Sequence, residues 1–278
     1  MLFDVIHPVT WGVLLVASYI DLRTREVPDW ISYGLIFAGI GVRSIYGYAE
    51  GTWSYVLEGT LGILVMFILA CIMFYTGQWG GGDSKLLIGL GALFGLTWKT
   101  PFQFTVFFLV CLFVVGALYG SSWSTYLFLR YRKKCTPYFL HIHRQGIGGR
   151  NFAWTGAFLV LTMGIFLVDR IFLPLFLVLG FSILLLYYTW LLLHALEKTC
   201  MQKAIAPAQL TEGDWIVEDV VVNGKRICGP SDLGIEKNQI ALLKRYYAEK
   251  KVGKILIKEG IPFVPVFLMA YLLLFFVL

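Results

Sequence analysis

Long apolar stretches, interrupted by short polar ones, occupy most of the chain. A membrane-spanning helix needs about 17–25 mostly apolar residues, and the candidate segments are 5–21, 31–48, 53–76, 84–98, 102–129, 152–168, 171–195 and 261–278. The fourth is short and rich in glycine, and Asp169 and Arg170 separate the sixth from the seventh as either a tight turn or a charge pair within one helix. The pattern predicts an all-α polytopic membrane protein with six to eight transmembrane helices.

The stretch 197–260, before the last apolar segment, lacks this pattern. It holds many of the 23 lysine and arginine residues and alternates like a soluble fold. Residues 220–227 predict two short strands around Asn223-Gly224, because a type I′ hairpin turn needs positive φ at both central positions. A helix over 235–251 and a strand over 254–258 complete a small α+β domain.

Lysine and arginine predict the orientation in the membrane, because cytoplasmic loops carry an excess of both. With the N-terminus outside, the basic loop 130–150 and the stretch 197–260 lie in the cytoplasm, and only Arg43, Lys99 and Arg170 fall on the other side. We therefore expect a multi-pass protein of the plasma membrane. Its predicted parts are a transmembrane domain at 1–196, a cytoplasmic domain at 197–260 and a last transmembrane helix at 261–278.

The composition of the chain agrees with a lipid environment and narrows its partners. Apolar residues make up 58% and charged residues 14%, against about 45–50% and about 25% in soluble domains. The net charge of +6 comes without a soluble basic stripe interleaved with aromatics, so membrane lipid is an expected partner and nucleic acid is not. The cysteines form no CxxC pair, and His141 and His143 have no carboxylate or cysteine beside them, so no metal or cofactor is expected.

Two acidic residues lie where apolar segments end on the same predicted side of the membrane. Asp21 closes the first segment and Asp83 opens the fourth. Two neighbouring carboxylates cannot both ionise cheaply, so they can share a proton, one acting as base toward a water and the other as acid. For either residue alone, a solvated helix end is the alternative.

Three glycines, Gly80, Gly81 and Gly82, precede Asp83. Backbone without Cβ atoms can take positive φ and lets another chain approach closely, so a peptide substrate could be held extended there by backbone hydrogen bonds. A flexible loop or a helix cap is the alternative. Further along, Gly91 and Gly95 have the GxxxG spacing that favours close packing against another helix.

These residues resemble the GxGD membrane aspartyl peptidases, and within them the type IV prepilin and archaeal preflagellin peptidases. Residues 21–29, DLRTREVPD, are similar to the family segment Asp-x-(Arg/Lys)-x-x-x-(Ile/Val)-Pro, and residues 80–93 are similar to its GGGD-x-K-(Leu/Met) block. Residues 259–265 resemble the proline-bearing start of the last helix in archaeal members. The resemblance covers roughly the first hundred residues and implies that Asp21 and Asp83 are the catalytic pair, with no cofactor.

The implied activity is cleavage of short basic leader peptides from pilin-like or flagellin-like precursors at the cytoplasmic membrane border. Bacterial members carry paired CxxC motifs and N-methylate the trimmed product, whereas this chain has no such pair. We therefore expect the archaeal type without methylation. The candidates for binding or positioning the substrate are Gly80, Gly81, Gly82, Lys85, Glu26 and Asp29.

Three alternative functions stay open. A presenilin-like or signal-peptide-peptidase-like protease shares GxGD and a late proline motif but cuts inside transmembrane helices, and it carries tyrosine where Ile20 precedes Asp21 here. A proton-coupled transporter uses paired membrane acids but is expected to show symmetric helix repeats, which the sequence lacks. A structural scaffold would leave residues 80–83 unexplained.

Overall fold

The structure is a computed structural model that describes residues 2–97, 104–146, 149–166 and 172–277. Lys99, Asp169 and Arg170 lie outside these ranges, so the predictions that concern them are not addressed. The chain forms two compact units. The first comprises residues 1–121, 205–255 and 260–278, and the second comprises residues 122–204 and 256–259.

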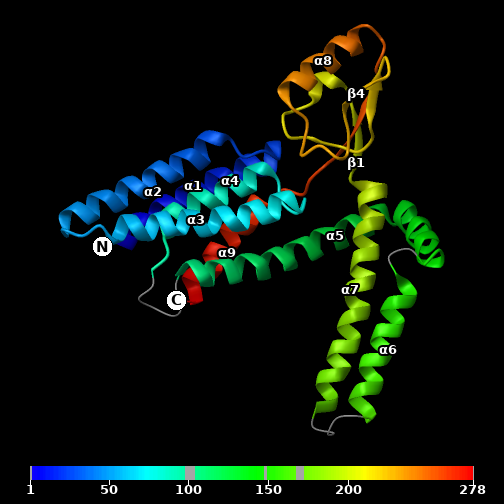
Figure 1. Cartoon of the computed structure of the whole chain (residues 1–278), viewed down its shortest axis with the longest axis horizontal. Coiled ribbons are helices and arrows are strands. Elements are labelled where there is room, and N and C mark those ends of the chain that lie inside the picture. Colours follow the sequence, from blue (N-terminus) through cyan, green and yellow to red (C-terminus); the bar gives the residue numbers. More distant parts are fainter. Residues whose placement is uncertain (1, 98–103, 147–148, 167–171, 278) are drawn as a thin grey trace. The chain divides into compact units, whose positions relative to one another are not determined.

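The first unit contains a bundle of helices. Its members are α1 (Leu2–Thr24), α2 (Asp29–Ala49), α3 (Ser54–Tyr75), α4 (Gly81–Phe94), the first part of α5 (Phe104–Arg144) and α9 (Val264–Val277). Helix α4 packs against both α2 and α3, and α1 packs against α9 (Figure 1). Because α4 has neighbours on several sides, its leucines Leu86, Leu87 and Leu90 are fully buried in the core of the bundle.

Helices α3 and α4 approach each other through glycine. A Cβ atom added to Gly91 would lie 2.6 Å from the carbonyl oxygen of Gly62, and one added to Gly62 would lie 2.8 Å from Cα of Gly95. Only glycine leaves room for backbones this close. The predicted role of Gly91 and Gly95 in close helix packing is confirmed.

The first unit also contains an insert, residues 205–255, with short strands, a 3-10 turn and an α-helix. Within the insert lie the strands β2 (Trp215–Ile216), β3 (Val220–Val222) and β4 (Lys225–Cys228) and the helices η2 (Pro207–Gln209) and α8 (Lys237–Ala248). The strands β1 (Gln202–Ile205) and β5 (Ile255–Lys258) flank the insert, and most of their residues belong to the second unit. One sheet has the order β1-β5-β2, and β3 and β4 form an antiparallel hairpin. Asn223 and Gly224 have φ of 53° and 76°, which confirms the predicted hairpin turn.

The second unit contains the rest of α5 with α6 (Arg150–Phe166) and α7 (Leu173–Cys200). Helices α6 and α7 lie side by side (Figure 1). The prediction of a loop over 130–150 is wrong, because α5 continues to Arg144 after a break in helical geometry at Tyr131. The continuation is amphipathic: Ile142 packs with Tyr187 and Leu191 of α7, which stabilises a helix in a cationic sequence.

Every predicted apolar segment overlaps a helix of the structure. Among the described residues, four helices are long and apolar enough to cross a membrane, namely α1, α3, α5 and α7. The chain is therefore a mostly helical membrane protein with a small sheet region. The number of spans between six and eight stays a prediction, as do the domain boundaries at 197 and 261.

Candidate functional site

Asp21 lies in the last turn of α1 and is buried, with 4% of its surface exposed. Its Oδ2 atom accepts a 2.9 Å hydrogen bond from the backbone amide of Val264, the first residue of α9. The amide of Phe263 also bonds to this carboxylate. The first amides of a helix have no partner within it, so Asp21 satisfies donors that the start of α9 leaves free.

Arg25 holds the chain after α1 beside the same segment. Its φ of 58° ends the helix, and its amide donates to the carbonyl of Asp21 at 2.8 Å. Its Nη1 atom donates to the carbonyl of Gly260 at 2.9 Å. Asp21 and the chain that follows it are thereby tied to the segment at the start of α9.

Asp83 lies in the first turn of α4 and is half-buried. Its Oδ2 atom accepts a long hydrogen bond, 3.4 Å, from the amide of Gly80. A Cβ atom on Gly82 would lie 3.1 Å from Cβ of Val27, so the missing side chain lets the first turn of α4 approach the segment that follows α1. The sequence analysis assigned these glycines to a substrate peptide, whereas Gly82 faces the protein's own chain.

The two aspartates are neighbours, because the charge of Asp21 acts on the carboxyl group of Asp83. They lie on α1 and α4, which are in contact. Two carboxyl groups in such a position favour a singly protonated state, since a second negative charge at short range is costly. A base and an acid are then available together, which is the requirement for activating water and protonating a leaving group.

The other predicted site residues have contacts of their own. Lys85 and Asp29 form an exposed ion pair at 2.6 Å. Glu26 is exposed, and its charge acts on Asp214 of the insert. A Cβ atom added to Gly81 would lie 3.8 Å from Cε2 of the Phe74 ring.

Sequence reasoning missed three groups beside Asp21. Two are the backbone amides of Phe263 and Val264, for which the available signal was the pair of prolines at 262 and 265 that marks the start of a helix with free donors. The third is Tyr119 of α5, a half-buried residue that experiences the charge of Asp21. No local pattern points to Tyr119, because its neighbourhood is set by packing between distant segments.

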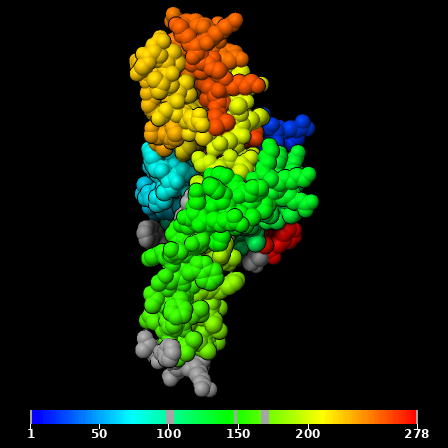
Figure 2. Space-filling model, turned by 90° about the vertical axis from the view of Figure 1, so that its right-hand side faces the viewer, coloured from blue at the N-terminus to red at the C-terminus, as the bar shows by residue number. Residues whose placement is uncertain are grey.

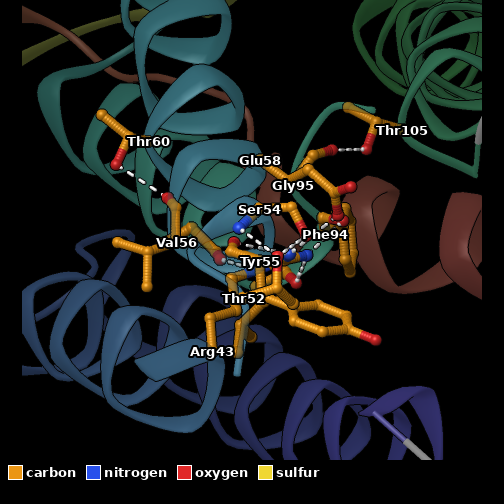
Figure 3. Close-up of polar contacts among 12 residues, drawn as sticks. Arg43, Thr52, Ser54, Tyr55, Val56, Glu58, Thr60, Phe94, Gly95 and Thr105 are labelled. Atoms are coloured by element: carbon orange, nitrogen blue, oxygen red, sulfur yellow. Dashed lines mark hydrogen bonds and ion pairs between the residues drawn. The ribbon is translucent and has the colours of Figure 1, made fainter. Parts of the chain in front are cut away.

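Arg43 of α2 fixes the opposite end of α4 (Figure 3). Its side chain is 1% exposed and donates to the carbonyls of Ala92, Leu93 and Phe94 at 3.0, 2.8 and 2.6 Å. Its charge is balanced by Glu58 of α3 at 3.6 Å. Helix α4 has 14 residues, or about 21 Å, against about 30 Å of hydrocarbon, so its last carbonyls need partners within the protein.

Within the described ranges, no group of three His, Cys, Asp or Glu side chains is arranged to hold a metal ion. The chemistry available at the site is that of carboxyl groups, backbone amides and a phenol.

Comparison with known proteins finds relatives of this part of the chain. Residues 9–121 match the type IV leader peptidase family. Preflagellin peptidases of Methanocaldococcus jannaschii and Methanococcus voltae are 38% and 32% identical over 80 residues, and that of Methanococcus maripaludis is 39% identical over 85 residues. Each alignment covers 29% of this chain and 34% of the relative, so the match spans about a third of the relatives' length.

No solved structure matches the chain. The segment matched by the family runs from α1 into α5 and contains both aspartates and both motifs that surround them. Residues 9–121 of this chain are therefore similar to the type IV leader peptidase family.

Proposed function

We propose that this protein is a membrane-embedded aspartyl peptidase that removes short basic leader peptides from flagellin-like or pilin-like precursors. The observation that carries the proposal is the pairing of Asp21 and Asp83, on separate helices, within electrostatic range of each other. The family match over residues 9–121 and the names of the preflagellin peptidases support it.

The proposed reaction needs one protonated and one ionised carboxyl group. The ionised group removes a proton from a water molecule as its oxygen attacks the scissile carbonyl carbon, and the other group donates its proton to the carbonyl oxygen, which gives a gem-diol. The first group then passes the proton it took from water to the leaving nitrogen, and the second group takes a proton back from a gem-diol hydroxyl as the carbonyl forms again. Proton transfer to the amide nitrogen lets the C–N bond break. The backbone amide of Val264 holds the carboxylate of Asp21 in one orientation. We therefore assign Asp21 as the fixed member of the pair, and Asp83 lies in the half-buried first turn of α4.

Negative charge near the pair Asp21 and Asp83, here called the dyad, suits a basic leader peptide. Glu26 and Asp29 follow α1 within eight residues of Asp21, and both are exposed. Lys85 already pairs with Asp29, so we assign leader attraction chiefly to Glu26 and a structural contribution to the ion pair. We further propose that α1 to α7 and α9 make a multi-pass arrangement in the plasma membrane, with the insert on the cytoplasmic side.

The test is cleavage of a flagellin-like and a pilin-like precursor by the reconstituted full chain, followed by mass. Asp21→Asn and Asp83→Asn keep the side-chain shape and remove the proton chemistry, so each is expected to abolish leader release. Glu218→Gln, at an exposed acid of the insert, is the matched control and is expected to cleave normally. Persistent cleavage by either dyad variant contradicts the mechanism.

The position of the cut separates this proposal from the alternative intramembrane protease. Cleavage at the border between leader and hydrophobic helix supports a leader peptidase. Cleavage within the apolar helix of the precursor, at a depth shown by product mass, supports an enzyme of the presenilin type. A wild-type protein that binds but never cuts several precursors contradicts both.

A further inference from the structure

The second half of α5 carries several cations and no acidic residue. Residues 130–144, here called the cationic segment, contain Arg130, Arg132, Lys133, Lys134 and Arg144, and the sequence has no Asp or Glu between positions 122 and 168. The nearby acids of the same unit are already used, since Glu197 pairs with Lys258 at 3.2 Å and Glu259 with Lys203 at 3.6 Å.

The cationic segment is amphipathic, and its apolar side is held against α7. Cys135 and Ile142 are buried, and Cys135 Sγ lies 3.0 Å from both Thr199 Oγ1 and Cys200 Sγ at the end of α7. Arg132, Lys133 and Lys134 are exposed, as are His141 and Arg144. The apolar side therefore packs on α7, and the cations point away from the protein.

Because the cationic segment packs against the end of α7, its cations lie at the membrane border. Helix α7 is apolar from Leu173 to Leu196, and its first charged residues are Glu197 and Lys198. Large apolar side chains of α6 and α7, including Phe158 and Phe181, are exposed, and Figure 2 shows the face of α6 in green. The segment thus adjoins the polar end of a helix pair whose sides suit hydrocarbon.

Aromatic rings support the same placement. The guanidinium of Arg130 lies over the rings of Tyr126 and Tyr131, 5.9 and 5.5 Å from their centroids, and donates to the hydroxyl of Tyr126 at 2.8 Å. Tyrosine and arginine in this combination are typical of the interface between hydrocarbon and headgroups.

We propose that the exposed face of the cationic segment binds the phosphate headgroups of anionic membrane lipids. Clusters of lysine and arginine beside a membrane helix attract anionic lipid strongly, by about fivefold in affinity per cation. A phosphate ester supplies negative charge that complements these cations, and a membrane surface presents many such groups to several cations at once. This proposal is independent of peptidase activity.

The test uses the full chain in vesicles of phosphatidylcholine and phosphatidylglycerol in equal parts. Electron paramagnetic resonance of spin-labelled phosphatidylglycerol, against spin-labelled phosphatidylcholine, measures the selectivity of the protein for the anionic lipid. We expect a clear preference that falls with added salt, because exposed charges are screened. Arg132→Gln/Lys133→Gln/Lys134→Gln should lower this preference severalfold at low ionic strength, toward a ratio of 1.

The matched control removes the same charge elsewhere. Lys225→Gln/Lys244→Gln/Lys254→Gln changes three exposed lysines of the insert and should leave lipid selectivity close to that of the wild type. Equal selectivity in the wild type and the cationic-segment variant would overturn the proposal, and so would a wild type without preference for phosphatidylglycerol. If the variant keeps its selectivity but changes its orientation in the membrane, the cations serve topology only.

Discussion

The backbone amide of Val264 donates a 2.9 Å hydrogen bond to Oδ2 of Asp21, across 243 positions of sequence. The start of α9 is therefore part of the candidate active site, although α9 lies outside the segment that the leader peptidase family matches. A buried carboxylate that accepts backbone amides is held in one orientation, which suits a group that must meet a water and a second carboxyl group.

Replacing Val264 with proline tests the amide alone. Val264 is the first residue of α9, where proline is well tolerated because no helical hydrogen bond is lost. A hydrogen bond to a charged group contributes about 1.5–3 kcal/mol, so we expect kcat for leader cleavage to fall by about one to two orders of magnitude. Kinetic measurement on the reconstituted protein checks this result.

Val264→Ala is the control for packing. It keeps the amide and removes only methyl groups from a fully buried position, so it should lower stability by about 0.5–2 kcal/mol and leave kcat within a few fold. If the proline variant is folded and as active as the alanine variant, Asp21 does not depend on this bond.

The sequence predicted the helices of the bundle well, because their apolar runs have a single favourable environment. It also predicted the Asn223-Gly224 turn, whose positive φ angles few other residue pairs accept. These features depend on neighbours in sequence. Asp21 and Asp83 stood out for a similar local reason, since each is an acid at the border of an apolar run.

What the sequence could not supply depends on distant contacts. The bond from Val264 to Asp21 and the proximity of Tyr119 arise from packing between segments far apart. The helical continuation of α5 past residue 129 was missed because its cations suggested a loop, while its stability comes from Ile142 and Cys135 against α7. For Arg43 the sequence predicted only its side of the membrane, because the carbonyl groups that it contacts lie about fifty residues away along the chain.

Removing the Arg43 side chain should destabilise the bundle more than any change to its ion-pair partner. Arg43→Gln leaves three carbonyls of α4 and the carboxylate of Glu58 without their cation, which costs about 3–5 kcal/mol for a buried pair. Glu58 is 24% exposed, so Glu58→Gln should cost less. Unfolding in detergent and denaturant measures both values.

The double variant separates the ion pair from the carbonyl contacts. If the pair matters, Arg43→Gln costs less when Glu58 is already Gln, and the two changes are not additive. Arg43→Lys should recover part of the stability only, because one ammonium group cannot reach carbonyls that the planar guanidinium spans. Equal stability of the Arg43→Gln and wild-type proteins would contradict the proposed anchoring of α4 by Arg43.

A methyl group at Gly62 should separate α3 from α4. The added Cβ would overlap the carbonyl oxygen of Gly91, and overpacking of a close helix contact costs about 1–3 kcal/mol. Thermal unfolding of Gly62→Ala measures the loss. Gly41→Ala is the control, because nothing lies within 4 Å of a Cβ at that position of α2, and its stability should be unchanged or slightly higher.

The insert should show a pH dependence that Asp214 controls. Burial raises the pKa of the Asp214 carboxyl group above 3.8, with a further contribution from the charge of Glu26, while the hydrogen bonds from Thr211 oppose the shift. Because the folded pKa lies above the unfolded value, the native state holds the proton more tightly. Stability from this group is present at low pH and is lost as the pH rises through the folded pKa.

Asp214→Asn should therefore stabilise the insert at neutral pH and have a vanishing effect well below pH 3.8, where the carboxyl group is protonated in both states. The asparagine oxygen can still accept the 2.8 Å hydrogen bond from the amide of Thr211, so the turn itself is kept. Hydrogen exchange of peptides from residues 205–240, compared between variant and wild type at each pH, measures the local stability. A variant that is less protected than the wild type at neutral pH would mean that the ionised carboxylate holds this turn together.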